Sequence, residues 1–84
     1  MTTFTLRTDP GHGWLEVPFG ELRALSLNPT DFSRYSYRNG NTFYLEEDCD
    51  ASKFAEVWEA KHGRKIAFVT THDGAFIRNL PSIY

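Results

Sequence analysis

Hydrophobic and polar residues alternate in two short stretches near the start of the chain. In TFTLRT, residues 3–8, Phe4 and Leu6 are separated by threonine, and this period of two is typical of a strand with one buried face. The turn residues of DPGHG interrupt the pattern, and WLEV, residues 14–17, continues it up to Pro18. We expect these two stretches to pair as a hairpin.

A helical spacing of apolar residues follows. In PFGELRALSL, residues 18–27, Phe19, Leu22 and Leu25 recur every three positions after a proline that suits a first helical turn. Pro29 ends the pattern, because the residue before a proline is pushed out of the helical region. This stretch predicts a short helix.

The longer predicted helix begins after Asp50, which we interpret as its N-cap, and ends at Gly63. Phe54, Val57 and Trp58 form an apolar stripe along it. The opposite side of the same helical wheel carries polar residues: Ser52, Glu56 and Glu59. The outer face of this helix is therefore expected to be acidic.

Between the helices, YSYRNGNTFYLE predicts a hairpin around Asn39-Gly40. A two-residue loop would bury an arginine, so we favour a three-residue loop at positions 39–41. This register sets Tyr37 opposite Phe43 and Tyr35 opposite Leu45. It places both tyrosines on the buried face.

The C-terminal stretch KIAFVTTHDGAFIRNL predicts another hairpin, with a loop at residues 72–74. Four apolar residues would line one of its faces: Ile66, Phe68, Phe76 and Leu80. The resulting order is β-β-α-β-β-α-β-β. It indicates an α+β fold in a single domain, residues 1–84, with an antiparallel sheet, or two layers of hairpins, and helices on one side.

Composition narrows the class of protein. A chain of 84 residues has no room for a deep cofactor cavity, so we expect no cofactor. Its single cysteine, Cys49, excludes an internal disulfide and favours a reducing compartment. The N-terminus lacks a basic segment followed by an apolar run, and no stretch approaches the roughly 20 apolar residues that span a bilayer. We predict a cytoplasmic protein that is not embedded in a membrane.

Charge is distributed unevenly. The net charge is −2, but residues 41–60 contain six acids and one lysine. So little positive charge elsewhere argues against direct duplex DNA binding. One or two acids would suffice to support a helix start, whereas a larger patch can attract a basic partner. The candidate partner-binding residues are Glu46, Glu47, Asp48, Glu56 and Glu59.

Two other kinds of chemistry are weaker in the sequence. His12, Cys49 and His72 are the candidates for a metal site or an enzyme, but their spacing matches no recognisable zinc or nucleophile motif, so we predict neither. Single-strand binding sheets interleave aromatic and basic residues as this chain does at Arg34, Tyr35, Tyr37 and Arg38. The register above opposes that function, because it buries both tyrosines.

DPGHGWLEVP, YSYRNG, YLEEDCDASKF and FIRNLPSIY are similar to stretches of a family of small proteins encoded by bacteriophages and other mobile elements. The resemblance runs along nearly the whole chain and supplies no catalytic residues. It implies a phage-type origin and a location in the cytoplasm of a bacterial host. Short acidic phage proteins often act as anti-CRISPR or anti-restriction inhibitors, by occupying host surfaces that grip nucleic acid with arginine and lysine.

The leading hypothesis is therefore a non-enzymatic protein that inhibits a host nucleic-acid-handling defence complex through an acidic surface. Three alternatives stay open. They are a small single-stranded nucleic-acid-binding protein, a metal protein or enzyme, and a structural or regulatory phage component without an acidic site. The sequence predicts neither the identity of the partner nor the oligomeric state.

Overall fold

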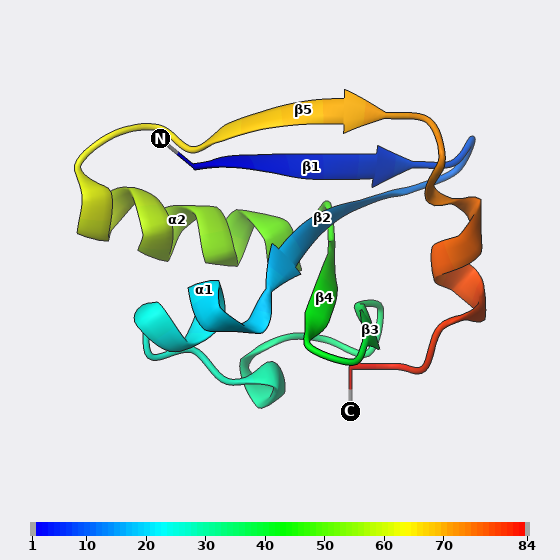
Figure 1. Cartoon of the computed structure of the whole chain (residues 1–84), viewed down its shortest axis with the longest axis horizontal. Helices are drawn as coiled ribbons and strands as arrows, with labels where there is room; N and C mark the ends of the chain where they lie inside the picture. Colours follow the sequence, from blue (N-terminus) through cyan, green and yellow to red (C-terminus); the bar gives the residue numbers. More distant parts are fainter. Residues whose placement is uncertain (1, 84) are drawn as a thin grey trace.

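Five strands form one sheet in the order β3-β4-β2-β1-β5 (Figure 1). The computed structural model describes residues 2–83. The strands are β1 (Thr3–Thr8), β2 (Gly13–Pro18), β3 (Tyr37–Asn39), β4 (Thr42–Glu46) and β5 (Ala67–Thr71). The helices are α1 (Phe19–Ala24), α2 (Asp50–His62) and two 3₁₀ turns, η1 (Pro29–Asp31) and η2 (Gly74–Asn79). The prediction of an α+β fold is confirmed.

The sheet is mixed, so the prediction of an antiparallel sheet is wrong at one edge. β1 pairs with β2, β2 with β4 and β4 with β3, all antiparallel, whereas β5 runs parallel to β1. The cause is α2, which carries the chain back along the sheet, so that β5 begins near the end from which β4 started. Parallel strands need such a crossover, and a helix usually provides it.

The expected C-terminal hairpin does not form. After β5 the chain turns into η2 instead of an eighth element of β structure. Gly74 lies against β1, where an added Cβ would be 2.9 Å from the carbonyl carbon of Thr8, so the start of η2 has room only for glycine. Ile77 is fully buried and packs with Trp14. The sequence predicted a strand here with every second side chain buried. The segment instead forms a 3₁₀ helix that buries Ile77.

The central hairpin exists, but its register differs from the prediction by one residue. Tyr37 pairs with Tyr44, and the loop is Gly40-Asn41. Gly40, with a φ of 61°, takes the first loop position, as glycine does in one class of two-residue hairpin turn. β3 begins only at Tyr37, so Tyr35 lies outside the strand and its side chain is exposed.

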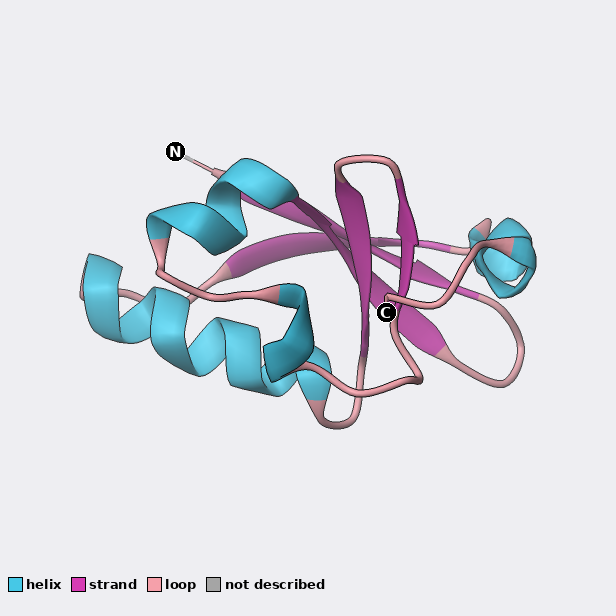
Figure 2. Ribbon diagram, turned by 90° about the horizontal axis from the view of Figure 1, so that it is seen from below, coloured by secondary structure: helices cyan, strands magenta, loops and turns pink. Residues whose placement is uncertain are grey.

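The core lies between α2 and the sheet. Phe4 meets Phe54 and Trp58 edge to face, with ring centroids 5.4 and 6.1 Å apart. Gly63, with a φ of 69°, ends α2 as expected. A smaller cluster around Trp14 lies under η2. Figure 2 shows α1 and α2 together at one end of the sheet and η2 at the other. This leaves room for a pocket beside η2.

Candidate functional site

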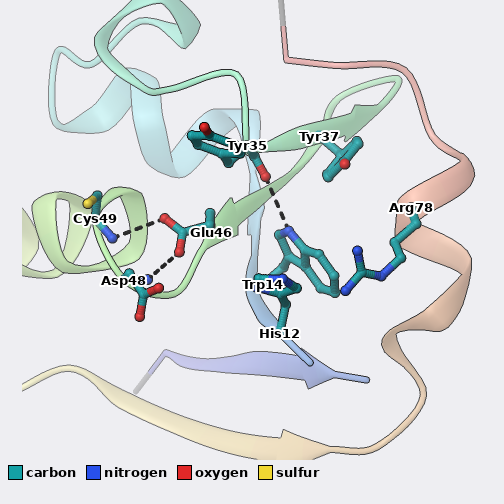
Figure 3. Close-up of a pocket in the computed structure, with 8 residues that line it drawn as sticks. All are labelled: His12, Trp14, Tyr35, Tyr37, Glu46, Asp48, Cys49 and Arg78. Atoms are coloured by element: carbon teal, nitrogen blue, oxygen red, sulfur yellow. Dashed lines mark hydrogen bonds between the residues drawn. The ribbon is translucent and has the colours of Figure 1, made fainter. Parts of the chain in front are cut away.

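A pocket of about 310 Å³ opens beside the small aromatic cluster, between the β1–β2 turn, the segment before β3, the loop after β4 and η2. Figure 3 shows its side chains, which include three large aromatic rings, acids, bases and a thiol. They are His12, Trp14, Tyr35, Tyr37, Glu46, Asp48, Cys49 and Arg78. We call this the aromatic pocket. It combines residues that the sequence assigned to three competing functions.

Trp14 forms the back wall of the aromatic pocket. It is 3% exposed, and its Nε1 donates a hydrogen bond of 3.3 Å to the backbone carbonyl of Tyr35. Tyr37 meets its ring edge to face, with centroids 6.1 Å apart. Tyr35 itself is 74% exposed, so the prediction that both tyrosines are buried is wrong. The protein therefore presents an exposed aromatic ring at an aromatic cavity.

Arg78 contributes a positive charge that is already paired. Its guanidinium carbon lies 5.3 Å from the centroid of the Trp14 ring, and its Nε donates to the carboxylate of Asp9. The bond from Arg78 holds the pKa of Asp9 well below its usual range, and the backbone N–H groups of His12 and Gly11 lower it further. Arg78 and Asp9 are 69 positions apart, so no local spacing predicted their pairing.

The acidic loop begins with Glu46, whose carboxylate has a structural role. It is 9% exposed, and its two oxygens accept the backbone N–H groups of Asp48 at 2.7 Å and Cys49 at 3.1 Å. These bonds hold the tight turn between β4 and α2. Glu46 lines the aromatic pocket, but its carboxylate is largely engaged.

Asp50 is not the N-cap of α2, which corrects the prediction. It is the first helical residue, and Cys49 takes the cap position without a side-chain bond. Asp50 is 4% exposed, and its Oδ2 accepts three hydrogen bonds. Two come from Ser33, from the backbone N–H at 2.9 Å and from the side-chain hydroxyl at 2.7 Å, and the third comes from the hydroxyl of Ser36 at 2.5 Å. Ser36 Oγ in turn accepts the backbone N–H of Glu46 at 2.9 Å. Asp50 therefore anchors the segment that carries Tyr35.

The other predicted partner-binding acids differ from one another. Glu59 is half-buried; its Oε2 accepts the backbone N–H of Ile66 at 2.9 Å, and its Oε1 lies 3.7 Å from Lys65 Nζ. Three acids remain exposed, and their carboxylates make no hydrogen bond or ion pair within residues 2–83. These are Glu47, Asp48 and Glu56, which we call the outer carboxylates. Only these three are free to meet a partner.

The residues of the two rival functions are only partly brought together. His12 and Cys49 line the aromatic pocket, but His72 does not, and its Nδ1 lies 3.1 Å from the hydroxyl of Thr8. Among residues 2–83, no group of three histidine, cysteine or acidic side chains is arranged to hold a metal ion. Arg38 lies over the Phe43 ring, 4.9 Å from its centroid, and does not line the pocket.

Comparison with known proteins adds no relative: no family model, curated protein or solved structure matches the chain significantly. Within the described part of the chain, no helix is both long enough and apolar enough to cross a bilayer.

Proposed function

We propose that this protein is a non-enzymatic binding protein whose aromatic pocket and outer carboxylates together engage a basic surface of a partner protein. The observation that carries the proposal is the exposed ring of Tyr35, which stands at a cavity backed by Trp14 and bordered by the carboxylate of Asp48. Aromatic faces attract cations, and arginine does so more often than lysine. A carboxylate beside such rings adds a charge-assisted hydrogen bond.

The balance of charge around the aromatic pocket favours a cationic occupant. Arg78 is neutralised by Asp9, whereas Asp48, which also lines the pocket, has no counterion within residues 2–83. A phosphate entering here would meet unpaired negative charge, and an arginine side chain would relieve it. Arginine side chains of the partner can therefore meet the Tyr35 ring and the Asp48 carboxylate.

Proteins that grip nucleic acid present rows of arginine and lysine, and a surface of this kind would compete for them. Together with the resemblance to phage-encoded proteins, this supports inhibition of a bacterial defence complex, of the anti-CRISPR or anti-restriction type, in the cytoplasm of the host.

A direct test uses an arginine-rich octapeptide as the probe, titrated into ¹⁵N-labelled protein and followed by two-dimensional NMR. We expect the Trp14 indole signal and the amides of Tyr35, Tyr37 and Asp48 to shift, and the shifts to fall when Tyr35 is changed to alanine. Absence of shifts at these positions at millimolar peptide would contradict the proposal.

The partner itself is sought by pull-down from a bacterial lysate followed by mass spectrometry. The bait is wild type or the variant Glu47→Lys, Glu56→Lys, with Glu21→Lys as a control on α1. We expect the double variant to lose a nucleic-acid-handling complex that wild type and the control retain, because like charges brought together cost several kcal/mol. Retention of the same proteins by all three baits would exclude the outer carboxylates as the contact.

A second candidate function, single-strand binding, is favoured by the same exposed ring of Tyr35, since its neighbours Tyr37 and Arg34 suit stacking and phosphate contact. The two functions respond oppositely to charge. Changing Glu47 to lysine would strengthen the binding of an oligonucleotide and weaken that of an arginine-rich peptide. Fluorescence anisotropy with a single-stranded 12-mer at two salt concentrations distinguishes them.

A further inference from the structure

The two edges of the sheet are finished differently. At the β3 edge, Tyr37 bridges to Ser82 and the backbone N–H of Arg38 donates to the carbonyl of Pro81 at 3.0 Å, so the C-terminal segment covers that edge. At the opposite edge, β5 pairs with β1 on one side only. Figure 1 shows every helix lying on the inner side of β5. Nothing within residues 2–83 pairs with the outer side of β5.

β5 also lacks the features by which proteins usually protect an edge. Its sequence is AFVTT, without a charge or a proline, and no bulge interrupts its pairing with β1. Phe68 is 51% exposed and Val69 is 54% exposed, one on each face of the strand. Edge strands that expose backbone and apolar side chains together are templates for pairing with another strand.

We propose that β5 pairs antiparallel with β5 of a second copy of this chain, about a two-fold axis at Val69, and so joins the two sheets into one. A two-fold interface must be complementary to itself. With Val69 opposite its own copy, Phe68 stands opposite Thr70 and Ala67 stands opposite Thr71. Each pair then occurs twice and buries an apolar or threonine side chain.

Both faces of the joined strands are apolar at the axis. Val69 of each copy forms a direct cross-strand pair on one face. On the other face the two Phe68 side chains become diagonal neighbours, within reach of each other. Phe68 also borders a groove of about 270 Å³ between the sheet and α2, lined by apolar groups such as those of Leu6 and Ile66 and, on its polar side, by Glu47. The second Phe68 extends this apolar surface.

Charge favours this register and a second copy as the occupant. The same pairing places Lys65, just before β5, opposite Asp73 of the other copy, just after it. The Lys65 side chain is 92% exposed and that of Asp73 is 59% exposed. Within one chain Asp73 already accepts from Arg7 and Thr71, and Lys65 lies 3.7 Å from Glu59, so the pairs across the axis would add to these contacts. Two such ion pairs flank the axis, one at each end. An unrelated strand would pair equally well only if it carried an apolar residue at the centre and the same opposite charges at its two ends.

The first test is the mass in solution, measured by sedimentation equilibrium between about 10 µM and 1 mM protein. We expect a concentration-dependent species of twice the 9.7 kDa of one chain. Val69→Lys brings two lysines together at the axis and should abolish it, whereas Thr30→Lys, on the exposed η1 turn, should not. A monomer across the whole range, or a dimer unaffected by Val69→Lys, would overturn the proposal.

The second test asks whether the register is right, by mixing two charge variants. Lys65→Glu alone opposes two acids at each end of the interface, and Asp73→Lys alone opposes two lysines, so each variant should dimerise at least tenfold more weakly than wild type. Mixed together, they regain opposite charges at both ends, and dimers should return. Arg34→Glu controls for the change in net charge, and thermal melting confirms that each variant is folded. If the mixture dimerises no better than the separate variants, this register is wrong; larger open-ended assemblies would equally refute a closed two-fold pair.

Discussion

The carboxylates of YLEEDCD divide into two kinds that the sequence does not distinguish. Glu46 and Asp50 are buried and each accepts several hydrogen bonds, whereas Glu47 and Asp48 between them are exposed. The inner pair accepts bonds from backbone N–H and hydroxyl groups, among them the buried hydroxyl of Ser36. The outer pair is free. Acids that are neighbours in the chain therefore differ in whether their loss should affect the fold or the binding of a partner.

The largest effect should follow from Asp50→Ala. This change removes three hydrogen bonds and leaves two serine hydroxyls and a backbone N–H without their acceptor, so we expect the free energy of unfolding to fall by about 3 kcal/mol. Urea denaturation measures it. A loss of only about 1 kcal/mol, the usual cost of a helix cap, would mean that the buried bonds contribute little.

Glu46→Gln should have the next largest effect. The amide oxygen can still accept one backbone N–H, but the amide NH₂ faces the other donor, so we expect a loss of about 1–2 kcal/mol. The same denaturation experiment gives the value, with Glu56→Gln as the matched control. Equal stability of the two variants would contradict the distinction between inner and outer acids.

A pH series extends the comparison to Asp9, whose partner is Arg78. Because the folded-state pKa of Asp9 is depressed, its stabilising contribution is present above the ordinary aspartate pKa and is lost as pH falls from there toward the folded-state value. Arg78→Gln should therefore show a weaker loss of stability on acidification between about pH 5 and pH 2.5. Thermal melting of both proteins across this window provides the check, and parallel curves would argue against the pairing.

The smallest effect on stability should come from the outer carboxylates. Asp48→Lys and Glu56→Lys lie on the surface and break no bond within residues 2–83, so each should change the free energy of unfolding by no more than about 0.5 kcal/mol. The same variants should weaken capture of a basic partner. If either variant is strongly destabilised, the carboxylate it replaces has a structural role like those of Glu46 and Asp50.

Local patterns predicted the elements whose causes are local. The hairpin of β1 and β2 follows from alternation on both sides of a turn, and α2 follows from its apolar stripe and from Gly63. The parallel pairing of β5 and the conversion of the last strand into η2 depend on where α2 delivers the chain. No spacing within the stretch KIAFVTT carries that information.

The candidate site was only partly predictable for the same reason. The acidic residues were visible, but their division depends on Ser33 and Ser36, which lie 17 and 14 positions before Asp50. The exposure of Tyr35 depends on this anchor too, because it diverts the segment before β3 has begun. Trp14 and Arg78 come from opposite ends of the chain. No pattern in the sequence predicted that the Arg78 guanidinium would lie over the Trp14 ring.

The pairing of β1 with β5 also has a kinetic consequence. Thr3 lies beside Ala67, far along the chain from it, so β1 is synthesised long before both of its edges can be paired. Closing so long a loop costs chain entropy before any contact repays it, and pairings between distant segments slow folding. During this interval β1 exposes an unpaired edge, and a nascent chain is most open to mispairing there. Formation of the sheet therefore ends with β5, which is also an edge strand of the finished sheet.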